Sequence, residues 1–123
     1  MLMFTVIVEK SFAASHQLTL PDGKKESLHE HNWKVVAAVS ADKLDSVGMA
    51  IDFEIVKGML EQVLAPLRNS RFETLEFFSG KNASAENLAQ YIYEKFSPLL
   101  PAGLALNYIE ITEAPGCRVR YCQ

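Results

Sequence analysis

Three histidines are the residues of this sequence best suited to chemistry, and all lie in its first quarter. His29 and His31 are two residues apart, so on a β-strand their side chains point to the same side. His16 lies at the end of the preceding extended segment, where it is in phase with Phe12 and Ala14. If the two segments pair as a hairpin, His16 comes close to His29 and His31. Three neutral imidazoles suit Zn²⁺ and leave a fourth position for water or substrate. The pattern predicts such a site, against the alternative of three unrelated polar strand residues.

Two strands must position these histidines. Residues 3–16 alternate as an extended segment does, and residues 17–28 contain the Pro, Asp and Gly of a turn or loop. Residues 29–41 form the strongest strand pattern, because the second and third histidines share a face with Trp33 and the apolar residues after it. We therefore expect a hairpin that carries all three imidazoles on one face.

The rest of the chain predicts two helices followed by two strands. Asp52 is the expected N-cap of a first helix whose apolar residues keep helical spacing as far as Pro66, and Ser84 is the expected N-cap of a second. Residues 104–113 and 117–122 read as strands joined by a turn. This order predicts an α+β fold, with the helices gathered on one side of an antiparallel sheet.

Length and composition narrow the class of protein. The 123 residues fit one domain, 1–123, and the net charge of −3 argues against nucleic acid or an anionic membrane as the main partner. The first residues do not read as a signal peptide, and no apolar run approaches the ~20 residues of a membrane span. Cys117 and Cys122 are too few for a disulfide scaffold. We expect both to be reduced in a cytoplasmic protein.

Five short motifs together carry a family resemblance. In chain order they are Phe12-Ala13-Ala14-Ser15-His16, His29-Glu30-His31-Asn32-Trp33, Ile51-Asp52-Phe53, Asn82-Ala83-Ser84-Ala85-Glu86-Asn87-Leu88-Ala89, and Glu113-Ala114-Pro115 followed by Tyr121. Their order and combination resemble the 6-pyruvoyl-tetrahydropterin synthase and 6-carboxy-tetrahydropterin synthase family, over essentially the whole chain.

The resemblance implies a tunnelling fold, in which a four-stranded antiparallel sheet has two helices on one face. Three such sheets would form an oligomeric β-barrel, two trimers would stack into a hexamer, and active sites would lie between subunits. It also implies Zn²⁺ on the three histidines, a pterin ring anchored by Glu113, and substrates derived from 7,8-dihydroneopterin triphosphate. From the residue type alone, a carboxylate such as Glu113 can accept two hydrogen bonds from a pterin.

One departure from the family concerns the catalytic group. Lys25 stands where the family usually has a cysteine, four residues before the histidine pair. Glu26, three residues before the pair, resembles a variant in which glutamate replaces that cysteine and the side chain is cleaved to give 6-hydroxymethyl-7,8-dihydropterin. A carboxylate beside a metal site is a suitable base for a substrate hydroxyl. The alternative is a solvated loop charge beside Lys24 and Lys25.

Three further positions depart from the family. Arg68 and Asn69 stand where the family has an Asp-His pair, so the relay histidine is absent. Arg68 is a candidate for holding a phosphate or carboxylate of the substrate, with a surface arginine near a helix end as the alternative. Glu30 replaces the glycine between the metal histidines.

These observations favour a zinc-dependent pterin lyase or synthase that cleaves the substrate's side chain. A 6-carboxy-tetrahydropterin synthase of queuosine (deazapurine) biosynthesis is the alternative within the enzyme class, and Lys25 and Asn69 count against it. A noncatalytic zinc- and pterin-binding homologue and a structural metal-binding oligomer are the alternatives outside it.

Overall fold

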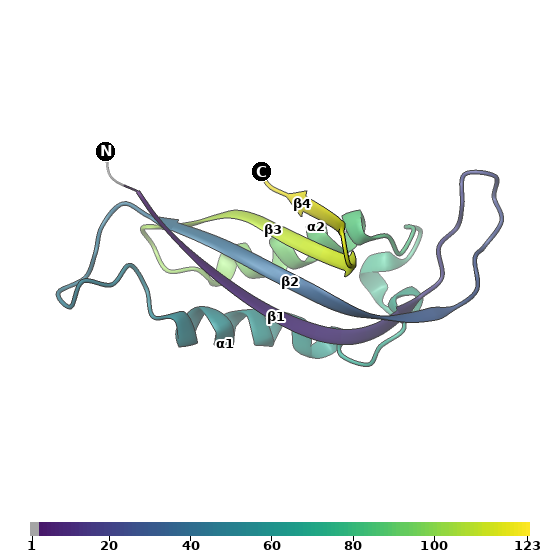
Figure 1. Ribbon diagram of the computed structural model, residues 1–123, viewed down its shortest axis with the longest axis horizontal. Coiled ribbons are helices and arrows are strands. Elements are labelled where there is room, and N and C mark those ends of the chain that lie inside the picture. Colours follow the sequence, from purple (N-terminus) through teal and green to yellow (C-terminus); the bar gives the residue numbers. More distant parts are fainter. Residues whose placement is uncertain (1–2) are drawn as a thin grey trace.

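A four-stranded antiparallel sheet forms one layer of the molecule. The computed structural model describes residues 3–123, and the sheet order follows the chain, β1-β2-β3-β4. The strands are β1 (Phe4–His16), β2 (His29–Ala41), β3 (Leu104–Ala114) and β4 (Cys117–Tyr121). The first two make a long twisted hairpin whose connecting loop extends beyond the other elements (Figure 1). The predicted hairpin is confirmed.

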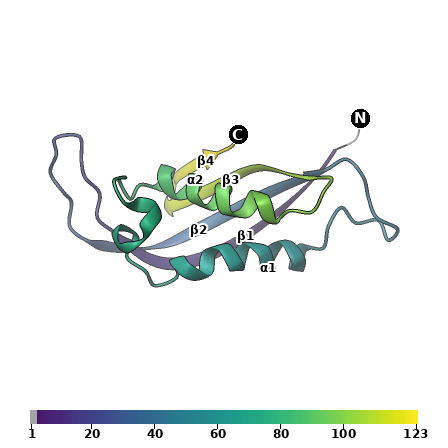
Figure 2. The same cartoon turned by 180° about the vertical axis from the view of Figure 1, so that it is seen from behind.

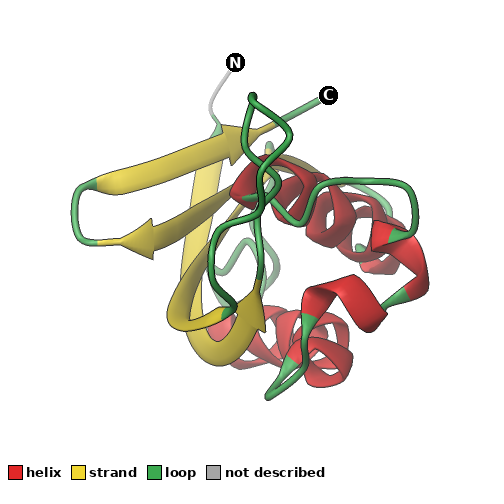
Figure 3. Cartoon of the chain, turned by 90° about the vertical axis from the view of Figure 1, so that its right-hand side faces the viewer, coloured by secondary structure: helices red, strands yellow, loops and turns green. Residues whose placement is uncertain are grey.

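Two helices cover one face of this sheet (Figures 2 and 3). They are α1 (Phe53–Leu64) and α2 (Ala85–Phe96). Both predicted N-caps are confirmed: a side-chain oxygen of Asp52 accepts from the Glu54 N–H at 2.8 Å, and that of Ser84 accepts from the Asn87 N–H at 3.2 Å. A short 3₁₀ turn follows each helix, and two more lie in the connection from α1 to α2. The α+β class and the arrangement of the helices are therefore confirmed.

The core lies between the sheet and the helices. The alternation of β1 and β2 turns one set of side chains toward α1 and α2, and the largest of these, Trp33 and Phe12, are fully or almost fully buried. The hairpin register sets His16 directly opposite His29. A slip of β1 by one residue would turn His16 and Phe12 to the opposite face, so burial of the core fixes the position of this histidine.

No helix within residues 3–123 has both the length and the apolar character needed to cross a membrane. The barrel and the hexamer that the resemblance implies stay predictions.

Candidate metal centre

Three histidines meet where the long hairpin joins its connecting loop. The side chains of His16, His29 and His31 each place a ring nitrogen within 4.8 Å of the other two. His16 is fully buried, while the other two are partly exposed. The pairing of β1 with β2 produces this convergence, since both strands turn the same face toward the helices. The structure thus brings together the three residues predicted as metal ligands.

Two backbone carbonyls orient the imidazoles. Nδ1 of His16 lies 2.7 Å from the carbonyl oxygen of Ala83, and Nδ1 of His29 lies 2.7 Å from that of Ser27. A carbonyl can only accept, so these partners assign the N–H to Nδ1 in both rings. In the neutral ring, Nε2 then carries a lone pair, which is the state in which histidine binds a metal.

The two Nε2 atoms face each other at short range. Nε2 of His16 and Nε2 of His29 are 3.0 Å apart, although in the neutral rings the carbonyl contacts leave neither a proton to donate. Two lone pairs at this distance repel each other unless a cation lies between them. Tetrahedral Zn²⁺ with bonds of 2.0–2.1 Å spaces its ligands by about 3.3 Å, which falls within the 3.0 to 4.8 Å found here. The donor set therefore fits a tetrahedral metal ion.

Two carboxylates flank the histidines. Oε1 of Glu26 lies 3.5 Å from Nε2 of His29, and it also accepts a hydrogen bond from the Leu18 N–H at 3.2 Å. Oε1 of Glu113, at the end of β3, lies 3.4 Å from Nε2 of His16 and 3.9 Å from that of His31. Glu26 is therefore directed at the cluster, and both predicted carboxylates reach the same site as the histidines.

The surroundings of His31 favour its neutral form. Burial lowers the pKa of its imidazole, the Glu113 carboxylate acts in the opposite direction, and the neighbouring His29 and His16 lower the pKa further. The net direction is downward. A neutral imidazole has the free lone pair that metal binding requires.

Aromatic side chains form the floor of the site. The ring of Trp33 packs edge-on against His16 with ring centroids 5.0 Å apart, and its Nε1–H donates to the Ala14 carbonyl at 3.1 Å. Phe72 lies behind the indole, with centroids 5.3 Å apart. This packing fixes the imidazole that lies deepest in the site.

Comparison with known proteins identifies the family. The family model for 6-pyruvoyl tetrahydropterin synthase matches residues 5–123. The chain belongs to this family. The predicted resemblance is confirmed, whereas the glutamate variant of the family stays a prediction.

The relatives of this protein include enzymes with two different names. Human 6-pyruvoyl tetrahydrobiopterin synthase is 30% identical over 76% of this chain and 74% of its own length. The 6-carboxy-5,6,7,8-tetrahydropterin synthase of Synechocystis sp. is 28% identical over 97% and 93%. Among solved structures, 6-pyruvoyl tetrahydropterin synthase from Caenorhabditis elegans superposes with a TM-score of 0.85 at 23% identity, covering 100% of this chain and 97% of that one. The fold of the family is thereby confirmed.

Arg68 is the predicted site residue that lies apart from the histidines. Its Nε donates to Oε2 of Glu61 at 2.8 Å, its second nitrogen pairs with Oε1 of the same carboxylate, and its third donates to the Ser11 carbonyl at 3.0 Å. Lys10 contacts that carboxylate as well, at 2.8 Å. A role for Arg68 in substrate binding stays a prediction.

The pH dependence of unfolding measures how much the ion pair between Arg68 and Glu61 contributes to stability. Hydrogen bonds from Arg68 and Lys10 lower the pKa of Glu61 to about 2. A lowered pKa contributes stability above the ordinary carboxyl pKa of 4.5 and loses it as the pH falls toward 2. Between pH 5 and 3 we expect wild type to lose more unfolding free energy than Glu61→Gln, by less than about 1 kcal/mol because the pair is partly exposed. Urea unfolding at several pH values measures this; parallel curves would contradict it.

The sequence analysis missed the groups that hold the histidines in place. The carbonyls of Ala83 and Ser27 belong to the backbone, so residue types gave no indication of them. Glu73 was also missed: its Oε1 accepts from the N–H of Gln17, the residue directly after His16.

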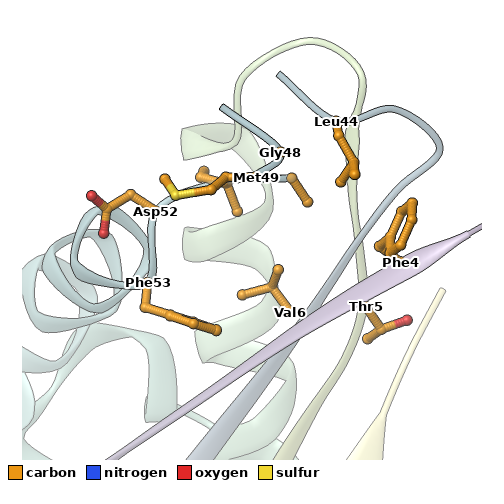
Figure 4. A pocket seen from close by; sticks show the side chains of 10 residues that line it. Phe4, Thr5, Val6, Leu44, Gly48, Met49, Asp52 and Phe53 are labelled. Atoms are coloured by element: carbon orange, nitrogen blue, oxygen red, sulfur yellow. The ribbon is translucent and has the colours of Figure 1, made fainter. Parts of the chain in front are cut away.

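A separate apolar pocket lies at the opposite end of β1. It has a volume of about 390 Å³, and Figure 4 shows the side chains of Phe4, Val6, Met49 and Phe53 around it. Its carboxylate, Asp52, caps α1. The candidate chemistry therefore lies at the histidine end of the hairpin.

Proposed function

We propose that this chain is a zinc-dependent lyase that cleaves the side chain of 7,8-dihydroneopterin triphosphate to give 6-hydroxymethyl-7,8-dihydropterin. The observation that carries the proposal is the carboxylate of Glu26, 3.5 Å from a ring nitrogen of the histidine cluster. By the motif resemblance, Lys25 occupies the position where members of the family usually have a cysteine. Of the two carboxylates beside the histidines, Glu26 is the proposed base, because Glu113 is assigned to the pterin ring.

Glu26 is the proposed base for the hydroxyl on the second carbon of the side chain. When it takes this proton, the bond between the first and second side-chain carbons breaks. The second carbon leaves as an aldehyde that carries the triphosphate, and the electron pair left on the first carbon is delocalised into the pterin ring until a proton arrives there. Zinc, when bound to the three histidines, would act as a Lewis acid toward the substrate's oxygens.

One enzyme with this fold has a glutamate at a catalytic position. A 6-pyruvoyltetrahydropterin synthase from Plasmodium vivax, with a TM-score of 0.78 and 19% identity, is described as a variant in which alanine replaces a catalytic glutamate. A second variant of that protein carries cysteine at the same position. In that enzyme, glutamate and cysteine were thus exchanged at a catalytic position, in line with the change we infer between the family's usual cysteine and Glu26.

Incubation of the zinc-loaded protein with 7,8-dihydroneopterin triphosphate tests the proposal. Mass analysis that finds 6-hydroxymethyl-7,8-dihydropterin would support it. A 6-pyruvoyl product, formed by loss of the triphosphate with the side-chain carbons retained, would overturn side-chain cleavage. Binding without any product would indicate a noncatalytic homologue.

A second candidate is a 6-carboxy-tetrahydropterin synthase of the kind used in deazapurine synthesis. The 28% identity with the Synechocystis enzyme over 97% of the chain favours it. Lys25 and Asn69 replace the cysteine and histidine expected for that chemistry. The same incubation decides, because a 6-carboxy product differs in mass from the hydroxymethyl one.

The pterin ring is the proposed ligand of Glu113. Glutamine at this position keeps the shape but loses the charge, and a charge-assisted hydrogen bond contributes about 1.5–3 kcal/mol. We therefore expect Glu113→Gln to raise KM by about 10- to 100-fold with little change in bound zinc. Steady-state kinetics together with metal analysis measure both, and an unchanged KM would exclude the anchoring role.

We further propose that the enzyme works as a trimer or hexamer in the cytoplasm. The sheet ends in two edge strands, β1 and β4, whose outer backbone groups can pair with another copy. Cys117 and Cys122 are both free and exposed, which suits a reducing compartment. Sedimentation analysis is expected to give three or six chains, and a monomer would contradict the barrel.

A further inference from the structure

The loop that carries Glu26 has little apolar packing to hold it in place. Residues 17–28 connect β1 to β2 and extend beyond the other elements (Figure 1). Every residue from position 19 to position 25 is exposed, so burial does not fix this part of the loop. The proposed base must nevertheless stay beside the histidine cluster to act on a substrate bound there. Polar contacts are therefore left to position it.

Hydrogen bonds join Glu26 to the first residues of the same loop. The N–H of Glu26 donates to the Leu18 carbonyl at 3.0 Å, and its Oε1 accepts from the Leu18 N–H at 3.2 Å. An isolated antiparallel bridge joins Thr19 to Lys25. The position of Glu26 thus depends on the position of Leu18 and Thr19.

Asn82 fastens this part of the loop to the start of α2. Its side-chain oxygen accepts from the Thr19 N–H and its amide nitrogen donates to the Thr19 carbonyl, both at 2.9 Å. Among residues 3–123, Asn82 is the one residue outside the loop that hydrogen-bonds any part of residues 18–26. Asn87 holds Asn82 in turn, because its Nδ2 donates to the Asn82 carbonyl at 2.8 Å.

The next residue, Ala83, holds the other side of the site. Its carbonyl oxygen lies 2.7 Å from Nδ1 of His16. Asn82 and Ala83 stand immediately before Ser84, the N-cap of α2. The start of α2 therefore sets a metal ligand and the loop of the proposed base relative to each other. The sequence motif of residues 82–89 thus does more than begin a helix.

We propose that Asn82 is a positioning residue that holds Glu26 beside the histidine cluster. The inference rests on the proposed function, in which Glu26 is the base. Loss of the Asn82 amide frees Thr19, and with it the hydrogen-bonded part of the loop that carries Glu26. The carboxylate then spends less time within reach of the substrate hydroxyl, and a displacement of about 1 Å can lower a rate by about 10²-fold.

Steady-state kinetics of the zinc-loaded protein with 7,8-dihydroneopterin triphosphate test this role. Asn82→Ala is expected to lower kcat by about 10- to 100-fold, with wild-type zinc content and little change in KM. The control Gln90→Ala removes an amide of α2 that donates to Oε1 of Glu94 at 3.0 Å, on the exposed side of the helix. Its kcat should match that of wild type. An unchanged kcat in Asn82→Ala would overturn the inference.

A double variant separates positioning of the base from a general loss of structure. If Asn82 acts through Glu26, its replacement should cost nothing further once the carboxylate is absent. Glu26→Gln and the double variant Glu26→Gln/Asn82→Ala should then have the same kcat. A loss by the same factor in both backgrounds would mean that Asn82 acts on something other than Glu26, and the inference would be wrong.

Limited digestion with trypsin measures the loop itself and needs no turnover. Cleavage after Lys24 and Lys25 should be about tenfold faster in Asn82→Ala, because two hydrogen bonds no longer oppose local opening. Cleavage after Lys43, in the exposed loop between β2 and α1, should keep its wild-type rate. Wild-type rates after Lys24 and Lys25 would overturn the anchoring, whatever the products. Faster cleavage there, with a wild type that forms no hydroxymethyl product, would refute the proposed function alone.

Discussion

Replacement of Glu26 by glutamine is expected to lower kcat with 7,8-dihydroneopterin triphosphate by about 10²–10⁴-fold, the usual contribution of a positioned base. The amide has nearly the same shape and keeps an oxygen for the Leu18 N–H, which Glu26 accepts at 3.2 Å. It cannot take a proton from a hydroxyl. The loss should therefore appear in kcat with little change in KM.

Glu30→Gln is the matched control for this experiment. It removes a carboxylate from the residue next to His29, on the face of β2 that points away from the histidine cluster. Its kcat should stay close to that of wild type. Undiminished turnover in Glu26→Gln would exclude this carboxylate as the base, and equal losses in both variants would indicate a general effect of charge.

His31→Ala is expected to weaken zinc binding by more than about 100-fold. Loss of a residue that only hydrogen-bonds a metal ligand already lowers metal affinity by about 10- to 100-fold, and loss of the ligand itself should cost more. Turnover should fall with the bound metal. His31 is partly exposed at the end of the hairpin, so the core beneath it is left unchanged and the variant should fold. Competition with a chromophoric chelator measures the affinity, and circular dichroism checks the fold.

Asn32→Ala provides the comparison for the metal measurement. Asn32 follows His31 on β2 and is exposed on the opposite face. Its zinc affinity should match that of wild type. Wild-type affinity in His31→Ala as well would mean that the metal is held elsewhere, and the account of the site would then be wrong.

Local patterns in the sequence were enough to predict most of the fold. Alternation along β1 and β2 placed His16 on the face shared by Phe12 and Trp33, and the structure buries all three together. Asp52 and Ser84 marked the helix starts because their side chains satisfy free N–H groups of the first turn. These features depend on neighbours within a few residues.

Contacts between distant segments could not be predicted in this way. The carbonyl of Ala83 meets His16 across 67 positions of sequence, and a carbonyl is present at every residue. Arg68 is engaged by Glu61, seven residues earlier, which a search for ligand-binding arginines does not reveal.

X-ray absorption at the zinc edge, together with metal analysis, tests the central claim most directly. The account predicts one zinc ion per chain, bound by three imidazole nitrogens at about 2.0–2.1 Å and by one further oxygen. Zinc coordinated by sulfur at about 2.3 Å, or a chain that binds no zinc, would contradict it.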